Sequence, residues 1–333
     1  MRQMEEQMLR FLEKIDDPWG ISWRVVNLIK RLSLQRTVRF TLGYIRSIRY
    51  ERPVFVIGVP RSGTTMLFHL LRESSQLGAL PHEGHNVWRM FHHPRSVGWR
   101  SDVVRQGEVR FGERRFVNAY FYSYFSAKRF VEKTPENCLR IPYLLDLFPD
   151  AYFVVVKRNP CDVINSLING WQHPKGHFRS YYVPKDLRIP EYPHRRRWCF
   201  ALIEGWRNYV TSPIHHIAFS QWEQCIKAIV AARDLVPSSR WIEVNLEHIL
   251  ARPDETLSRI CEGIGIQNCP SLKKKLAELL AKPVNALSAL GTNKGRRENK
   301  QEITELLPKI AALALETGYI INAKTGDFEI RDG

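Results

Sequence analysis

A glycine-bearing loop is the clearest candidate for chemistry in this chain of 333 residues. The run Pro53–Gly58 is rich in β-branched and aromatic side chains, which predicts a buried parallel strand. The loop Val59–Thr65, with the sequence VPRSGTT, follows, and apolar residues at helical spacing begin directly after it. In such a strand–loop–helix unit the loop N–H groups and the positive end of the helix converge, so the segment predicts an anion-binding site.

The loop has the spacing of a nucleotide-binding Walker loop but a different cation. Gly58 and Gly63 are placed as in G-x-x-x-x-G-K-[ST], yet Thr64 stands where the lysine should be. Arg61 supplies a cation inside the loop instead. An arginine between a buried strand and a helix amino terminus adds to an already positive potential, which an anion would balance.

The end of a second predicted strand is also cationic. Residues 151–156 form a β-branched and aromatic run that ends in Lys157 and Arg158, where a kinase or ATPase has a carboxylate that holds Mg²⁺. This pattern predicts a metal-free site. A sulfonate in transfer carries one negative charge rather than two, so arginine, lysine and loop amides alone can neutralise it. The residues therefore favour sulfuryl transfer over phosphoryl transfer.

Three further segments resemble the sulfotransferases that use 3′-phosphoadenosine 5′-phosphosulfate (PAPS), in the bacterial, carbohydrate and tyrosylprotein branch whose loop reads PRSGTT. Residues 131–137 read VEKTPEN, and residues 157–166 read KRNPCDVINS, which is similar to the family's 3′-phosphate segment. Residues 241–260 are similar to its late strand and following helix. The resemblance covers about residues 53–320 and implies PAPS as donor, with adenosine 3′,5′-bisphosphate (PAP) as product.

The resemblance also implies which residues bind the donor. The loop would hold the 5′-phosphosulfate, an arginine and a serine eight positions apart would bind the 3′-phosphate, and a basic segment near the carboxyl end would close over that phosphate. The family usually has a tryptophan after this basic segment, where the present chain has Glu298 and Asn299. The donor-binding residues implied are Arg61, Ser62, Gly63, Thr64, Thr65, Arg158, Ser166, Lys294, Gly295 and Arg296.

Candidate catalytic residues come from two other segments. In the branch resembled here a glutamate at about this distance from the loop is the general base, which implies Glu83. His82 and His85 are rivals, because imidazole titrates near neutral pH. We expect partial burial to raise the pKa of Glu83, since an ordinary carboxylate is a weak base for an alcohol. Lys133 matches the family position that reaches the leaving oxygen and would form a cationic clamp with Arg61.

The acceptor is a hydroxyl compound whose class the sequence leaves open. A carbohydrate, a small alcohol, a lipid head group and a peptide tyrosine would all serve. Residues 171–198 are rich in aromatic, proline and basic residues without a clean period, which predicts a functional lid rather than disorder. We expect acceptor recognition there and around residues 88–99.

The amino-terminal part is predicted to be a helical extension, residues 1–50, attached to a sulfotransferase domain of residues 51–333. Residues 23–50 carry basic and apolar residues and no acid, which indicates a basic amphipathic helix or helix pair. This segment either makes a weak contact with an acidic membrane surface or a partner, or packs its apolar stripe on the domain with its basic face in water.

Composition and cysteine usage set the broad class. A hydrophobic fraction of 44% and a charged fraction of 25% are those of an ordinary globular protein, which excludes collagen-like and disordered chains. The formal charge of +16 favours anionic partners. Six scattered cysteines without a CxxC pair indicate reduced thiols. We expect neither a signal peptide nor a membrane anchor, because residues 1–14 carry charges throughout and no apolar run approaches the roughly 18 residues of a membrane span. We expect a cytoplasmic protein.

Strands near residues 53–58, 129–132, 151–156 and 240–244, separated by helices, predict an α/β, P-loop-type three-layer fold with a central parallel β-sheet flanked by helices. Two other functions stay open. One is an ATP- and Mg²⁺-dependent P-loop phosphotransferase. The other is a non-catalytic basic module that binds polyanions, either nucleic acid or acidic glycans, through residues 195–197 and the carboxyl-terminal loop. For the favoured sulfotransferase we expect no specific nucleic-acid partner.

Overall fold

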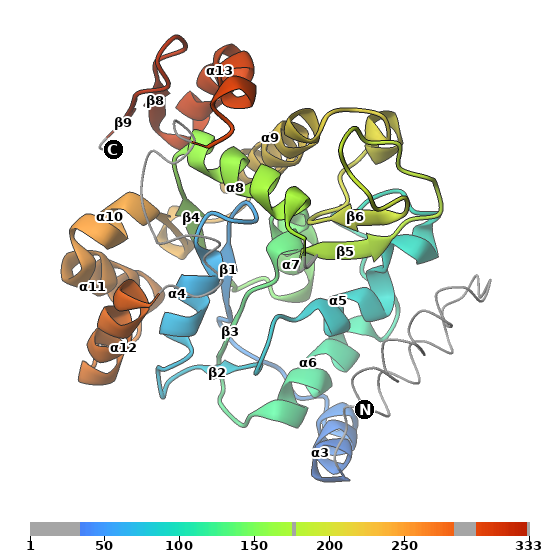
Figure 1. The fold of residues 1–333 in the computed structure, drawn as a ribbon. Coiled ribbons are helices and arrows are strands. Elements are labelled where there is room, and N and C mark those ends of the chain that lie inside the picture. The colour runs from blue at the N-terminus through green and yellow to red at the C-terminus, as the bar shows by residue number, and fades with distance from the viewer. Residues whose placement is uncertain (1–33, 175–177, 283–297, 332–333) are drawn as a thin grey trace.

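A computed structural model of the chain describes residues 34–174, 178–282 and 298–331. Its centre is a five-stranded sheet of parallel strands in the order β2-β3-β1-β4-β7 (Figure 1). The strands are β1 (Val54–Ile57), β2 (Gly78–Ala79), β3 (Phe130–Glu132), β4 (Tyr152–Lys157) and β7 (Trp241–Asn245). The four strands predicted from the sequence are confirmed, and β2 was not predicted.

The strand register brings three loops to one edge of the sheet. Phe55 in β1 lies beside Glu132 in β3 and beside Phe153 in β4. Because all three strands run in the same direction, the glycine loop after β1, Lys133 after β3 and Arg158 after β4 all emerge at the carboxyl end of the sheet. This is the edge at which open α/β sheets bind their ligands.

Alternating strand residues supply the two apolar layers. One face contributes Phe55 and Phe153 to a core with α5 (His85–His92), α6 (Glu113–Tyr124), α7 (Ile141–Leu147), α8 (Pro160–Gln172) and α9 (Ile214–Arg233). The other face contributes Val54 and Val154 to a core with α4 (Thr64–Leu71), α10 (Leu246–Ala251), α11 (Pro253–Ile264) and α12 (Pro270–Ala281). Figure 1 shows α10–α12 on one side of the sheet and α5 and α6 on the other. The predicted three-layer α/β fold is confirmed.

The remaining elements surround this centre. Two antiparallel hairpins are formed by β5 (Arg179–Tyr182) with β6 (Arg197–Cys199), and by β8 (Tyr319–Ile321) with β9 (Phe328–Ile330). Helix α13 is Lys300–Ala314, and helix α3, Leu34–Ile45, lies against α6. The six cysteines are free thiols, and all but Cys269 are buried. Within the described ranges, no helix combines the length and apolar character needed to cross a bilayer.

The described part of the amino-terminal segment is not oriented with a basic face in water. The Arg39 guanidinium donates to the Tyr122 carbonyl at 2.8 and 3.0 Å, and Arg36 lies over the Tyr124 ring, so two basic side chains of α3 face α6. Leu34 and Ile45 are exposed instead. The alternative in which the apolar stripe packs on the domain is therefore wrong for α3.

Candidate active site

The loop between β1 and α4 is shaped by two glycines. A Cβ atom at Gly58 would lie 2.6 Å from the Ser62 Oγ and 2.8 Å from the Val156 carbonyl oxygen, so no larger residue fits there. Gly63 has φ +102°, a left-handed conformation that favours glycine, and a Cβ there would lie 3.0 Å from Leu246 Cδ1. The chain therefore passes through the loop as a tight turn directly into α4.

The first turn of α4 points backbone donors at the loop. The N–H groups of Thr64 and Thr65 have no acceptor within the helix, because the first N–H groups of any α-helix lack one. Ser62 behaves differently, since its N–H and its hydroxyl both donate to the Val59 carbonyl, at 3.1 and 2.8 Å. Ser62 thus shapes the loop, and its predicted contact with a ligand would require its N–H to leave Val59.

Arg61 is the point at which the other predicted donor-binding residues meet. Its Nε donates to the Ser166 Oγ at 3.0 Å, and its carbonyl oxygen accepts from Arg158 at 3.1 Å. Its guanidinium lies 4.6 Å from the centre of the Phe178 ring. Arg61 has φ +79°, a strained conformation for a non-glycine residue. Burial, and then the charge of Arg158, lower the pKa of Arg61 to about 10.

The predicted basic contacts at residues 294–296 lie outside the described residues. The described chain resumes at Glu298 and Asn299, which are hydrogen-bonded to α8. The Glu298 carboxylate accepts from Asn165 at 3.0 Å, and the Asn299 amide donates to the Asn165 side-chain oxygen at 2.7 Å. Asn165 is the neighbour of Ser166 in the chain, so Glu298 and Asn299 are tied to the turn of α8 that carries the predicted 3′-phosphate serine.

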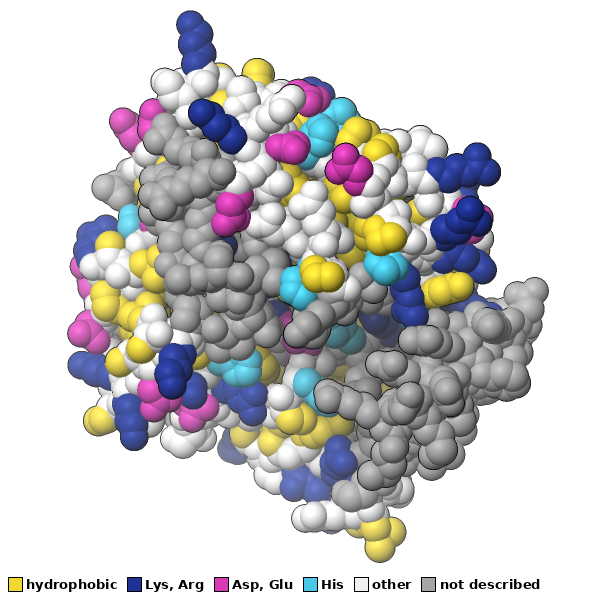
Figure 2. All heavy atoms as spheres, viewed as in Figure 1, with side chains coloured by type: hydrophobic (Ala, Val, Ile, Leu, Met, Phe, Trp, Pro, Cys, Tyr) yellow, Lys and Arg dark blue, Asp and Glu magenta, His cyan; other side chains and the backbone are white. Residues whose placement is uncertain are grey.

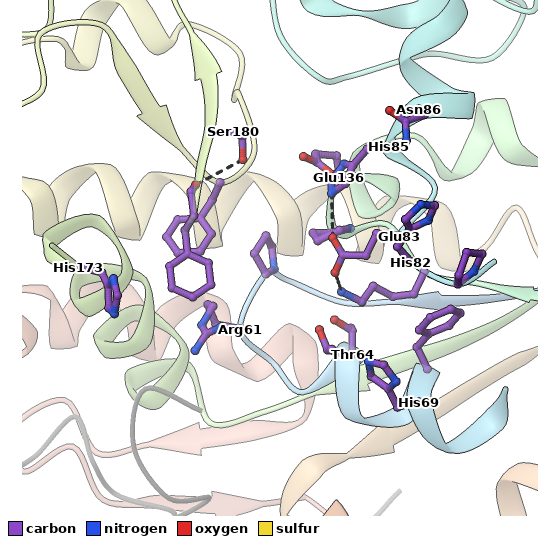
Figure 3. Close-up of a pocket in the computed structure, with 18 residues that line it drawn as sticks. Arg61, Thr64, His69, His82, Glu83, His85, Asn86, Glu136, His173 and Ser180 are labelled. Atoms are coloured by element: carbon purple, nitrogen blue, oxygen red, sulfur yellow. Dashed lines mark hydrogen bonds and ion pairs between the residues drawn. The ribbon is translucent and has the colours of Figure 1, made fainter. Parts of the chain in front are cut away.

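A chain of alternating charges lies across the pocket from Arg61 (Figure 3). The Lys133 ammonium, directly after β3, pairs with Glu83 Oε1, and His85 Nε2 lies 2.8 Å from Glu83 Oε2. His85 is the first residue of α5, and its other ring nitrogen lies 3.2 Å from Glu136 Oε2. Two predicted candidates for the base, Glu83 and His85, are therefore in direct contact with each other.

This arrangement fixes the protonation of the two candidates. Burial raises the pKa of Glu83, but the hydrogen bond from His85 and the charge of Lys133 outweigh it and lower the pKa to about 2. The predicted upward shift is therefore wrong for the unliganded protein. Burial lowers the pKa of His85, but the Glu136 carboxylate and the bond to Glu83 raise it to about 9. At neutral pH, Glu83 is thus ionised and His85 is protonated.

A second buried carboxylate holds the turn that carries Glu83. Glu132, the last residue of β3, accepts from the Gly84 N–H at 3.2 Å, from Thr134 Oγ1 at 2.5 Å and from Asn137 Nδ2 at 2.7 Å. Burial raises its pKa to about 7 despite these bonds. Because Gly84 lies between the two candidate bases in the chain, Glu132 positions both of them.

One cavity of about 910 Å³ joins the loop to the charged chain. Histidine side chains surround a hollow near the centre of the face in Figure 2. Among the predicted residues, Arg61, Thr64, Thr65, Glu83, His85 and Lys133 line the cavity, and so does the rival base His82. Ser62, Gly63, Arg158 and Ser166 do not line it. The predicted site residues thus divide into a group that lines the cavity and a group that does not, of which Arg158 and Ser166 contact Arg61.

The cavity also has walls that the sequence interpretation missed or placed only coarsely. Phe178, Ser180 and Phe200, from the β5–β6 hairpin and its flanks, line it, and the two phenylalanine rings stack with centres 5.1 Å apart. These three residues belong to or adjoin the 171–198 segment in which acceptor recognition is predicted. His69 and Asn86 were missed, although His69 follows Thr65 by one helical turn, which places both side chains on one face of α4.

Comparison with known proteins decides the family. A family model described as "Sulfotransferase family" matches residues 53–270, more than half of the chain. The chain belongs to the sulfotransferase family. The match therefore does not favour the phosphotransferase or the polyanion-binding alternative.

Individual members of the sulfotransferase family are distant. Nodulation protein NoeE of Sinorhizobium fredii (strain NBRC 101917 / NGR234) is 25% identical over 63% of this chain and 49% of its own length. An uncharacterized protein of Aquifex aeolicus is 29% identical over 47% of this chain and 22% of its own length. The chain thus spans half or less of these two relatives. Sulfotransferase STF9 from Mycobacterium avium, a solved structure, shares the fold at TM-score 0.56 and 17% identity, over 88% of this chain and 83% of that one.

Proposed function

We propose that this protein moves a sulfuryl group from PAPS to the hydroxyl of an acceptor, without a metal ion, and releases PAP. The observation that carries the proposal is the shared cavity. The anion-binding loop of β1 and α4 and the Glu83–Lys133 pair open into the same space of about 910 Å³. A donor phosphosulfate and an acceptor hydroxyl can therefore meet between the loop, which donates hydrogen bonds to an anion, and Glu83, which can accept a proton.

The residues around the loop suit a nucleotide with two phosphate-type groups. Gly58 and Gly63 let the loop pack closely against Val156 and Leu246, and the first-turn N–H groups of Thr64 and Thr65 supply donors for an anion. Arg61 lies at the mouth of this loop, with Arg158 and Ser166 behind it. The loop, with Thr64, Thr65 and Arg61, would hold the 5′-phosphosulfate, and Arg158 with Ser166 would hold the 3′-phosphate.

Bound PAPS supplies the sulfuryl group and a leaving group, PAP, that takes up negative charge. Lys133 and Arg61 both line the cavity and would stabilise that charge. The Lys133 side chain is only 2% exposed, so its ammonium acts in a medium that screens it weakly. The clamp predicted from the sequence is thus compatible with the positions of the two cations.

Glu83 is the better of the two candidates for the base. His85 holds its proton at neutral pH, because it lies between the carboxylates of Glu83 and Glu136. Glu83 is already ionised, yet its pKa is too low for a strong base while Lys133 pairs with it. When the ammonium of Lys133 turns to the sulfonate, Glu83 loses a favourable charge, its pKa rises, and proton transfer from the acceptor becomes easier.

The metal-free part of the proposal is supported by the cations after β4. Lys157 pairs with Glu243 on the neighbouring strand at 2.8 Å, and Arg158 donates to the loop at Arg61. Arg158 thus occupies the place at the loop where a nucleotide kinase would hold a metal-binding carboxylate. In residues 34–174, 178–282 and 298–331, the three-residue group with metal-ligand geometry is His215, His216 and Glu305, which do not line the cavity.

The acceptor would lie between the aromatic wall and Glu83. Phe178 and Phe200 offer a flat apolar surface, while His82, Asn86 and Ser180 offer hydrogen-bonding groups in the same cavity. This combination suits a hydroxyl on a ring: a carbohydrate or a peptide tyrosine. A small alcohol and a lipid head group remain candidate acceptors as well.

Transfer of radioactive sulfur tests the proposal. PAPS labelled with ³⁵S is incubated with the protein and a panel of oligosaccharides, tyrosine peptides, small alcohols and glycolipids, in buffer with EDTA. We expect labelled product from at least one acceptor class, unchanged by EDTA and lost in Lys133→Ala. A reaction that requires Mg²⁺ and ATP, or label transfer that persists in Lys133→Ala, would reject the proposed mechanism.

A further inference from the structure

Helix α3 presents an apolar stripe to solvent and its arginines to the protein. Leu34, Val38, Leu42 and Ile45 recur at the spacing of one helical face and are 83%, 50%, 38% and 65% exposed. An amphipathic helix on a globular protein normally buries such a stripe. The orientation of α3 is therefore the reverse of the usual one.

The packing on α6 fixes this orientation. A Cβ atom at Gly43 would lie 2.8 Å from the Tyr122 ring, so α3 and α6 approach closely at this position. Arg39 donates to the Tyr122 carbonyl and to Ser126, and Arg115 of α6 donates to the Tyr44 and Ile45 carbonyls at the end of α3. These contacts hold the helix on both sides of Gly43. Rotation that would bury the apolar stripe would break all of them.

The surroundings of the stripe are cationic. Residues 34–50 and 109–129, which contain α3 and α6, carry nine lysine or arginine residues and one acid. That acid, Glu113, is fully buried against His92. Arg46, Arg49 and Arg110 are exposed, and Phe111, just before α6, is fully exposed. At the foot of Figure 2, where α3 lies, hydrophobic and basic side chains are neighbours.

We propose that this surface, called the α3 face and made of Leu34, Val38, Leu42, Ile45 and Phe111 with the arginines beside them, docks on an anionic lipid bilayer. Apolar side chains that enter the headgroup region, together with arginines that contact lipid phosphates, are the features of interfacial membrane binding. None of these residues lines the active-site cavity, so this inference stands apart from the proposed reaction.

Charge selects the bilayer over a second copy of the chain. A symmetric dimer through the α3 face would bring the same surface of both protomers together. The exposed Arg46, Arg49 and Arg110 of one copy would then lie near those of the other, while the one acid of each copy, Glu113, is buried. Like charges brought together in an interface are unfavourable, whereas anionic lipid supplies both apolar depth and the opposite charge.

Vesicle flotation with the full chain tests the proposal. The probes are vesicles of phosphatidylcholine alone and of phosphatidylcholine with phosphatidylglycerol, each at low and high salt. We expect binding only to the anionic vesicles, weakened by salt. Val38→Asp, Ile45→Asp and Phe111→Ala should each lower the partition coefficient by roughly tenfold, because each removes apolar contact with the bilayer. Leu235→Asp and Leu315→Asp are matched controls, since these leucines are 51% and 58% exposed elsewhere, and they should bind as wild type does.

Circular dichroism melting and light scattering accompany the flotation. Wild-type protein that does not float with anionic vesicles, or Val38→Asp that floats equally well, would overturn the proposal. A dimer that Val38→Asp dissociates would assign the α3 face to a second copy instead. A much lower melting temperature for Val38→Asp than for Leu235→Asp would show that the chain itself covers this face, and would also overturn the proposal.

Discussion

The Lys133 ammonium and the Glu83 carboxylate form an ion pair in the pocket although fifty residues separate them in the chain. Lys133 is buried directly after β3, while Glu83 reaches it from the turn before α5. The pair compensates both charges before any substrate arrives. An incoming sulfonate competes with Glu83 for Lys133, so donor binding and activation of the base are coupled through one contact.

Replacing the carboxylate separates binding from turnover. Glu83→Gln keeps a hydrogen-bond acceptor for Lys133 but cannot take the acceptor proton, so we expect turnover to fall by about 10²–10⁴-fold. The affinity for PAP, measured by isothermal titration calorimetry, should stay near that of wild type. Glu73→Gln, an exposed glutamate beyond α4, is the matched control and should change neither quantity. Equal loss of PAP affinity and turnover in Glu83→Gln would make Glu83 a structural residue.

His85 predicts a pH dependence of stability. Its pKa is about 9 in the folded protein, above its value in the unfolded chain, because Glu136 and Glu83 outweigh burial. Its contribution to the free energy of unfolding is complete below pH about 6.5 and is lost as pH rises through about 9. We expect urea unfolding to show a loss on the order of 1–3 kcal/mol between these pH values in wild type, and a smaller loss in His85→Gln. Identical losses in both proteins would refute the assignment.

The tight packing around Gly58 predicts that one added methyl group weakens binding of the donor nucleotide. Gly58→Ala places a Cβ within 2.8 Å of a backbone oxygen in β4, so the loop must shift. We expect PAP affinity to fall by about tenfold or more, which corresponds to ~1.4 kcal/mol. Gly98→Ala is the control. Its φ of +66° makes alanine strained there, but a Cβ has no atom within 4 Å and Gly98 does not line the cavity, so PAP affinity should stay near that of wild type. PAP affinity that is unchanged in Gly58→Ala would place the nucleotide elsewhere.

Arg158 predicts selectivity for the 3′-phosphate. Arg158→Ala removes a cation that contacts the Arg61 carbonyl. We expect the affinity for PAP to fall by about 10- to 100-fold, because a charge-assisted hydrogen bond to the 3′-phosphate is lost. Adenosine 5′-phosphosulfate, which has no 3′-phosphate, should lose much less affinity. Arg195 is an exposed arginine between β5 and β6, so the control Arg195→Ala should leave both affinities unchanged. Equal losses for the two nucleotides in Arg158→Ala would remove Arg158 from the 3′ pocket.

Local sequence predicted the sheet and the loop because both depend on neighbouring residues. The β-branched runs of β1 and β4 and the left-handed Gly63 are visible without tertiary information. Strand β2 has only two residues, too few for a periodic signal. Lys133 and Glu83 were both assigned from the family resemblance, Lys133 within VEKTPEN and Glu83 by its distance from the loop, and the structure places both at the cavity.

Electrostatics could not be predicted in the same way. The pKa of Glu83 depends on Lys133 and His85, and the pKa of His85 depends on Glu136, which comes from another turn of the fold. Burial alone suggested an upward shift for Glu83, and pairing reversed its sign. The orientation of α3 likewise depends on Gly43 and on its contact with Tyr122, which no periodicity reveals.

Calorimetric titration of the wild-type protein with PAP in EDTA, beside a titration with ATP and Mg²⁺, tests the central claim most directly. The account predicts tight binding of PAP without any divalent ion and much weaker binding of ATP, with or without Mg²⁺. Tight binding of ATP that requires Mg²⁺, together with no measurable heat from PAP, would contradict it.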